Sequence, residues 1–203
     1  MWRVQTENDH SAFSTLVERW QERIRALCIR MTGNQHTSDD LVQETFARVF
    51  QKRAAFRGDS KFSTWVWRIA LNLCYDELRR LQRRQEHSLD DEDGDNENRN
   101  LRLQAIDFAT PNEHVQQQEE AEMVRGALMC LPELYRSVLV LRHYEGLKLR
   151  EIAEILEVPE GTVNSRMAEG LSRLARSLEP QLHKHQKKAP PSNGGRPKEI
   201  LTL

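Results

Sequence analysis

Cysteine and long apolar runs are both scarce in this chain of 203 residues. The three cysteines are widely separated and odd in number, which excludes a disulfide framework and a CxxC metal site and is typical of a reducing compartment. No apolar run approaches the roughly 18 residues that a membrane-spanning helix needs. The N-terminal segment lacks the apolar core of a secretory signal. We therefore expect a cytoplasmic protein that does not insert into membranes.

Motifs of catalysis and metal binding are also missing. The seven histidines are scattered, and the sequence contains no HExxH motif, nucleophile elbow or glycine-rich phosphate loop. The acidic stretch at Asp90–Asp95 lacks the alternating spacing and terminal glutamate of a calcium loop. We predict no catalytic residue, no metal site and no cofactor, so an enzyme is the least favoured class.

The net charge of −1 conceals a segregation of charge. Residues 1–84 contain 15 basic and 10 acidic side chains, residues 85–122 contain 2 and 12, and residues 123–203 contain 13 and 9. Two basic units separated by an acidic segment are typical of a protein that meets a polyanion, although solvated surface charge is the alternative. The acidic segment has too few apolar residues to offset the entropy of ordering, which predicts a flexible linker.

Helical periodicity dominates both basic units. Apolar residues recur three and four positions apart, and no stretch shows sustained period-two alternation. The sequence therefore predicts an all-α fold of two small helical domains joined by the acidic flexible linker. We expect Gly33 to end one helix and Ser38 to cap the next. The predicted boundaries are 10–84 for the first domain, 85–119 for the linker, 120–182 for the second domain and 183–203 for a disordered basic tail.

The second domain contains the pattern of a helix-turn-helix. Glu151–Leu156 predicts a short helix, the turn contains Gly161, and Thr162 is expected to cap a second helix with an apolar stripe. Such a second helix enters a major groove and would direct Asn164, Ser165 and Ala168 toward base edges. An α-hairpin that binds nothing is the alternative, and the turn glycine followed by an apolar residue favours DNA binding.

Three motifs, in order along the chain, resemble extracytoplasmic-function (ECF) sigma factors of bacterial RNA polymerase. Phe62–Leu73 with Asp76–Arg80 resembles region two, Asp39–Phe46 resembles its core-binding helix, and Leu131–Arg136 with Glu151–Arg166 resembles region four. The resemblance covers residues 10–84 and 120–179. It implies a sigma factor that binds core polymerase and directs transcription initiation at specific promoters. A helix-turn-helix regulator that binds DNA independently of core polymerase is the alternative, and an interaction-only adaptor is a third class.

The resemblance also implies partners and site residues. The partners are the β′ and β subunits of core polymerase and promoter DNA, and the resemblance allows an anti-sigma factor. The polymerase-binding residues would be Asp39, Asp40, Gln43, Glu44 and Arg48. The residues for the −10 element would be Phe56, Ser60, Lys61, Trp67, Arg68, Asn72, Arg79 and Arg80. The residues for the −35 element would be Thr162, Asn164, Ser165, Arg166, Ala168, Glu169 and Arg173.

Three of these positions and the nearby Trp65 need separate interpretation. Trp65 lies on the apolar stripe and is expected in the core, whereas Trp67 falls off the stripe and is the better candidate for a DNA contact. Asn164 stands where the family often carries a basic residue. Glu169 would repel phosphates, unless it accepts a hydrogen bond from a cytosine amino group.

Overall fold

The structure, a computed structural model, describes residues 1–203 except 57, 59–60, 91–114 and 189–203. The first lobe, residues 1–90, consists of α1 (Trp2–Thr6), α2 (His10–Thr32), α3 (Gln35–Gln51), the short 3-10 helix η1 (Arg53–Ala55) and α4 (Phe62–Asp90). The second lobe, residues 115–188, consists of α5 (Val115–Met129), α6 (Glu133–Leu139), the π-helical turn η2 (Val140–Tyr144), α7 (Leu149–Leu156) and α8 (Glu160–Lys188). Every regular element in this described part is a helix, which confirms the all-α prediction.

The caps of the first lobe show how the sequence sets its helices. Gly33 ends α2 in the left-handed conformation (φ 71°), and its N–H donates to the Ile29 carbonyl, as predicted. The predicted cap at Ser38 is wrong, because Asn34 already starts α3 by accepting from the Thr37 N–H at 3.0 Å. Ser38 is buried in the first turn, where its hydroxyl donates to the Asn34 carbonyl. An asparagine directly after a terminal glycine is the signal that marks this start.

The core of the first lobe lies between α2, α3 and α4, which pack against one another. It contains fully buried side chains such as Ile24, Val49 and Val66. Each contributes about 1.5–3 kcal/mol when removed from water. The short helix α1, which the sequence analysis did not predict, buries Val4. Its Gln5 side chain donates to the Arg53 and Phe56 carbonyls at 2.5 and 2.6 Å, which fixes the end of η1.

The second lobe contains the predicted helix-turn-helix, formed by α7 and α8. Glu157 makes the turn in the left-handed conformation (φ 55°), with its N–H donating to the Ala153 carbonyl. Helix α8 begins at Glu160, so Thr162 lies in its first turn and the predicted cap at Thr162 is wrong. At Gly170 a side chain would come within 3.3 Å of Leu139 and Tyr135. This glycine therefore allows α8 to pack closely against α6.

Both long helices run past the predicted ends of their domains. Helix α4 continues to Asp90 and α8 continues to Lys188, beyond the expected boundaries at 84 and 182. Most of the acidic segment and the end of the basic tail lie outside the described residues. Pro180 is accommodated inside α8. The predicted boundaries were placed where the apolar stripes end. The helices continue further because the residues beyond the stripes still favour helical structure.

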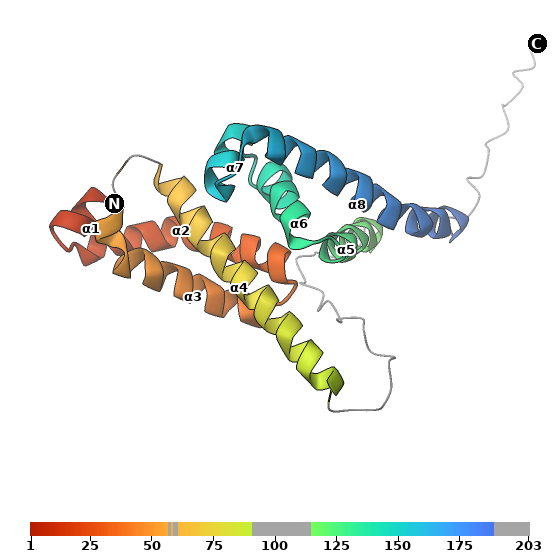
Figure 1. The fold of residues 1–203 in the computed structure, drawn as a ribbon, viewed down its shortest axis with the longest axis horizontal. Coiled ribbons are helices and arrows are strands. Elements are labelled where there is room, and N and C mark those ends of the chain that lie inside the picture. The colour runs from red at the N-terminus through yellow and green to blue at the C-terminus, as the bar shows by residue number, and fades with distance from the viewer. Residues whose placement is uncertain (57, 59–60, 91–114, 189–203) are drawn as a thin grey trace, which may run out of the picture.

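The two lobes lie against each other along one side (Figure 1). Helix α4 contacts α7, and α2 contacts α5, α6 and η2. Buried residues of the second lobe, including Val138, Leu141 and Ile152, belong to the same apolar cluster as Ile24 and Val66 of the first lobe. The sequence predicts two tethered domains, and its apolar pattern does not predict this shared core.

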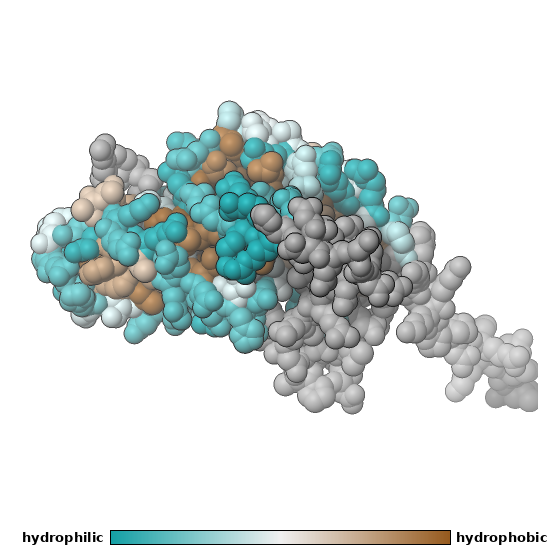
Figure 2. All heavy atoms as spheres, turned by 60° about the horizontal axis from the view of Figure 1, so that its bottom comes forward, coloured by the Kyte–Doolittle hydropathy of each residue, from teal (hydrophilic) through white to brown (hydrophobic). Residues whose placement is uncertain are grey.

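The outer surface of the described residues is mostly hydrophilic. On the face in Figure 2 hydrophilic side chains predominate, and apolar ones form small patches between them. Among the described helices, none combines the length and apolarity needed to cross a bilayer.

Candidate nucleic-acid and protein-docking surfaces

The predicted polymerase-binding residues lie together on the outer side of α3. Asp40, Gln43 and Glu44 are exposed, whereas the neighbouring Leu41 and Val42 are buried in the core of the lobe. The two remaining residues are paired: Asp39 with Arg25 at 2.5 Å and Arg48 with Glu44 at 2.8 Å. The result is a polar face of mixed charge on a helix that is fixed from behind by its apolar side. Such a face suits reversible docking, in which charge complementarity sets specificity and association rate.

Aromatic side chains cluster at the start of α4, where Phe56, Ser60 and Lys61 were predicted to contact the −10 element. The Phe56 ring lies 5.2 Å from the ring of Trp65, and the Phe62 ring lies 6.2 Å from that of Trp65. Trp65 is half-buried and packs against the core, in agreement with the sequence analysis. Ser60, another predicted contact, lies outside the described residues.

Trp67 does not lie where the periodicity placed it. Its side chain is 1% exposed, and its ring meets Trp20 edge to face at 5.7 Å between centroids. Helix α4 packs against α2, α3 and α7, so its buried face is wider than the single stripe assumed from the sequence. The prediction that Trp67 is off the buried face is therefore wrong. In this arrangement its indole cannot reach a base.

The other predicted −10 residues of α4 extend along the helix. Asn72, Arg79 and Arg80 are exposed. Arg80 makes two contacts of 2.7 Å with the Glu77 carboxylate, and Arg79 lies 3.4 Å from Asp76. Exposed pairs of this kind contribute little to stability, so both guanidinium groups remain free to exchange their partner for a phosphate.

Lys61 and Arg68 are engaged by the second lobe. The Lys61 ammonium lies 3.1 Å from the Glu151 carboxylate, and Arg68 lies 2.8 Å from that of Glu157. Arg68 also donates to the Glu154 carbonyl at 2.5 Å and the Ile155 carbonyl at 3.4 Å. The Lys148 backbone N–H, followed by Lys61, lowers the pKa of Glu151 below its usual value. Sequence reasoning missed these glutamates, because only the packing of the lobes brings them to α4.

Two further polar contacts join the lobes away from α4. The Glu145 side chain is 6% exposed and lies 3.2 Å from Arg23 and 3.8 Å from Arg30. Arg136 is 7% exposed and donates to the carbonyls of Leu128, Met129 and Leu131 in its own lobe at 2.7–3.0 Å. It also donates to the Met31 carbonyl at the end of α2, and burial lowers its pKa.

The predicted base-reading face of α8 is open. Asn164, Ser165 and Ala168 are exposed, Thr162 and Arg166 are half-buried, and Val163 is buried beneath them. The Ser165 hydroxyl donates to the Thr162 carbonyl at 3.0 Å. The three exposed side chains are small or polar, as close approach to base edges requires.

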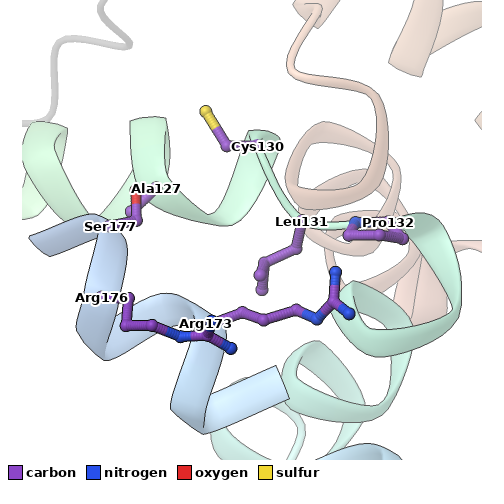
Figure 3. A pocket seen from close by; sticks show the side chains of 7 residues that line it. All are labelled: Ala127, Cys130, Leu131, Pro132, Arg173, Arg176 and Ser177. Carbon is purple, nitrogen blue, oxygen red and sulfur yellow. The ribbon is translucent and has the colours of Figure 1, made fainter. Parts of the chain in front are cut away.

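Glu169 neutralises two arginines of its own helix. Its carboxylate lies 2.6 Å from Arg173 and 3.8 Å from Arg176. The Arg173 guanidinium also lies 4.9 Å from the centre of the Tyr135 ring. Both arginines line a small cavity of about 220 Å³ with Cys130 and Leu131 (Figure 3). Arg173 and Arg176 are therefore both paired within their own lobe.

The described residues offer no cluster of histidine, cysteine, aspartate or glutamate side chains arranged to hold a metal ion. Cys28 and Cys74 are buried with their sulfur atoms 3.7 Å apart, and this contact, followed by burial, raises the pKa of Cys74. A buried thiol with a raised pKa is a poor nucleophile, so the pair is part of the packing of α2 against α4.

Comparison with known proteins finds a matching protein family for each lobe. The family Sigma-70 region 2 matches residues 16–84, and the family Sigma-70, region 4 matches residues 121–174. The chain is 35% identical to the ECF RNA polymerase sigma factor SigW of Bacillus subtilis, over 85% of this chain and 91% of that protein. It is 33% identical to the ECF RNA polymerase sigma-E factor of Haemophilus influenzae, over 88% and 93%.

Two solved structures have a similar fold. The sigma factor RpoE of Bartonella quintana, in complex with the anti-sigma factor NepR, aligns with a TM-score of 0.64 at 21% identity. The alignment covers 83% of this chain and 97% of that one. CnrH, in complex with the cytosolic domain of CnrY, aligns with a TM-score of 0.61 at 22% identity and covers 85% and 91%.

Proposed function

The chain belongs to the ECF sigma factors of RNA polymerase, and from this premise we propose how its surfaces divide the work of transcription initiation. Residues 10–84 bind core polymerase and capture the −10 element, and residues 120–182 read the −35 element. Residues 85–119 connect the two modules, and residues 183–203 form a basic tail. The chain itself carries out no catalysis, since the polymerase supplies the chemistry, and it acts in the cytoplasm with that enzyme.

The observation that carries this proposal is the outward face of the helix-turn-helix. Asn164, Ser165 and Ala168 are exposed on α8 while Val163 anchors the helix from within. In the first lobe, the exposed Asp40, Gln43 and Glu44 of α3 provide a separate docking face for the β′ subunit. A protein that both docks on polymerase and reads DNA needs two such independent surfaces. The β subunit is the corresponding partner for the second lobe.

An independent helix-turn-helix regulator would share the second lobe but would not need the α3 face. Fluorescence anisotropy on promoter duplex, with and without core polymerase, separates the two functions. We expect tight, sequence-specific binding only when core polymerase is present. Equally tight specific binding by the chain alone would favour the regulator. The two structural relatives are each described with a partner protein, an anti-sigma factor in the case of RpoE, and we propose an anti-sigma factor as a further partner.

The first expected result concerns Asn72. Its exposed amide on α4 is proposed to bind an extruded base of the −10 element, and a lost pair of such hydrogen bonds costs about 1–3 kcal/mol. Asn72→Ala should therefore reduce open-complex formation about tenfold or more while leaving affinity for core polymerase unchanged. Permanganate footprinting of the melted region measures this effect. Gln82→Ala, which removes another exposed amide of α4, is the control. A wild-type footprint for Asn72→Ala would refute the assignment.

A second expected result concerns α8, the second helix of the helix-turn-helix. Each phosphate contact adds about 0.9 to the slope of log affinity against log salt. With Arg173 and Arg176 held by Glu169, we expect a shallow slope of about −2 to −3 on duplex DNA. Glu169→Ala frees both arginines and should steepen the slope by about 1.8. Glu179→Ala removes the same charge at an exposed position of α8 and should leave the slope nearly unchanged.

Asn164 should behave differently from Glu169. Its amide can pair with adenine N6 and N7, so Asn164→Ala should cost about 1–3 kcal/mol at one promoter position. Transcription with core polymerase first identifies a promoter that the chain uses. Fluorescence anisotropy then measures the affinity of both variants for its −35 fragment and for fragments with single base changes. An Asn164→Ala loss spread evenly over all sequences would show that a different face of α8 reads the DNA.

A further inference from the structure

We propose that Trp2 is a stacking platform for an unpaired base of the melted promoter, so that α1 extends the −10 surface beyond the residues assigned to it above. This role rests on the proposed function, because the first lobe must be the part that binds the melted strand. It deepens that function by adding a residue that the sequence pattern did not indicate. It also adds a kind of contact, base stacking, that does not depend on the identity of the base.

Trp2 has the exposed aromatic ring that strand binding uses. It is 67% exposed, the highest value for a large apolar residue in the described part of the chain. The other three tryptophans are engaged in packing: Trp67 is 1% exposed, and Trp20 and Trp65 lie against the core. Since single exposed apolar residues are common on protein surfaces, the role of Trp2 depends on where it lies.

Trp2 lies next to residues that we assign to the −10 element. Three positions after it, the Gln5 side chain donates to the carbonyls of Arg53 and Phe56 at 2.5 and 2.6 Å. Residues three apart on a helix are neighbours on its surface, so Trp2 is beside this junction. Helix α1 and η1 lie at the same end of the first lobe as the start of α4 (Figure 1). An indole in this position can stack on a base adjacent to one that is captured near Phe56.

Helix α1 is anchored, as a platform requires. On the side of the helix away from Trp2, Val4 is fully buried, and Met1 packs against the apolar core. Asn8 follows α1 in the left-handed conformation (φ 51°), and its side-chain oxygen accepts from Arg53 at 3.1 Å. A ring on an anchored backbone loses less conformational freedom when a base stacks on it than a ring on a loose terminus would lose.

The charges around Trp2 favour contact with the face of a base and not with a phosphate. Arg3 is paired with Asp9 at 2.6 Å and lies 3.7 Å from Glu7. One cation and two carboxylates leave a net negative charge, which does not attract phosphate. The exposed Lys52, directly before η1, is the cation available to a neighbouring phosphate. Loss of the Trp2 ring should therefore weaken strand binding without changing the number of counterions released.

The first measurement uses the full chain bound to core polymerase and a promoter identified by run-off transcription. A 5-iododeoxyuridine replaces one base of the melted region at a time, and ultraviolet light links it to an aromatic ring stacked on it. We expect one position to cross-link to Trp2, located by mass spectrometry of the digested chain. The cross-link should disappear in Trp2→Ala, whose alanine preserves the helical propensity of α1.

The second measurement is the affinity of the same complex for a fluorescein-labelled, pre-melted promoter duplex over a salt titration. Trp2→Ala should lower the affinity about tenfold, as expected for the loss of one base stack. The slope of log affinity against log salt should not change. Trp2→Tyr keeps an aromatic ring and should restore most of the affinity. Tyr144→Ala, which removes an exposed ring of the second lobe, is the control and should bind as the wild type does.

An abasic site at the cross-linked position tests whether the ring and the base act on each other. With the wild-type chain, the abasic site should weaken binding about as much as Trp2→Ala does. With Trp2→Ala, it should cause no further loss, because the stacking partner is already absent. Exchange of one base for another at this position should have little effect, since every base has a π-face.

The absence of a cross-link to Trp2, or wild-type affinity in Trp2→Ala, would overturn the stacking role. The proposed function would survive either result, provided that the wild-type chain opens the promoter with core polymerase. Additive losses from Trp2→Ala and the abasic site, or an equal loss in Trp2→Tyr, would also overturn stacking and would show that Trp2 contacts polymerase or supports α1. Failure of the wild-type chain to open any promoter would overturn the proposed function, and the role of Trp2 with it.

Discussion

Replacement of Arg136 by methionine is expected to lower the free energy of unfolding by about 3 kcal/mol. The guanidinium, 7% exposed, donates to three carbonyls of its own lobe and to the Met31 carbonyl of α2. Loss of the donor removes this partner from the Met31, Met129 and Leu131 carbonyls, whereas the Leu128 carbonyl still accepts from the Leu131 N–H. An unsatisfied carbonyl costs about 1–3 kcal/mol where water cannot reach it. Part of this loss is offset, because methionine does not incur the cost of burying a charged guanidinium. The net effect should still be among the largest for a single substitution in this chain.

Urea unfolding followed by circular dichroism measures this difference. Arg142→Met is the matched control, because Arg142 is exposed in the same lobe and donates to the Leu147 carbonyl at 2.9 Å. Exposed substitutions of this kind change stability by only about 0.5 kcal/mol. Coincident unfolding curves for Arg136→Met and Arg142→Met would show that Arg136 does not hold the lobes and the α5–α6 junction together.

Charge reversal on α3 is expected to reduce affinity for core polymerase about a hundredfold or more. Asp40 and Glu44 are exposed on the face that we propose for docking, and like charges set against each other across an interface cost several kcal/mol. Each 1.4 kcal/mol is a factor of about ten in affinity. Helicity should not change in the Asp40→Arg, Glu44→Arg variant, because neither side chain faces the core.

Competition for core polymerase against the labelled wild-type chain measures this loss. The control is Glu18→Arg with Glu22→Arg, which makes the same change four residues apart on the exposed side of α2. We expect the control to compete as well as the wild type. If both double variants compete equally well, the exposed face of α3 is not the docking surface for core polymerase.

Most of the local structure of this protein could be predicted from its sequence. Apolar spacing predicted the helices of both lobes apart from α1, and Gly33 marked a break that the structure also has. The turn before α8 was predicted to contain Gly161, but Glu157 makes the turn and Gly161 lies inside α8. The errors at caps have a common cause. Ser38 and Thr162 were preferred as caps, although α3 begins at Gln35 and α8 begins at Glu160. Cap residues compete locally, and propensity alone does not rank them.

The packing of the lobes could not be predicted from the same pattern. An apolar stripe reports one buried face of a helix, but α4 is covered on more than one side. Trp67 was therefore interpreted as an exposed residue although it is 1% exposed. The ion pairs of Lys61 and Arg68 join residues about ninety positions apart, and charge composition does not specify such pairs. The sequence singled out Glu169 as a charge beside the base-reading residues, but its pairing with Arg173 is seen only in the side-chain geometry.

Run-off transcription with core polymerase tests whether this chain directs initiation at specific promoters. Core polymerase is incubated with fragmented genomic DNA, with and without this chain, and the transcript 5′ ends are mapped. We expect discrete starts that appear only with the chain, lie downstream of a shared pair of promoter elements, and are lost in the Asp40→Arg, Glu44→Arg variant. Transcripts identical to those of core polymerase alone, or starts that persist when α3 is reversed in charge, would contradict this expectation.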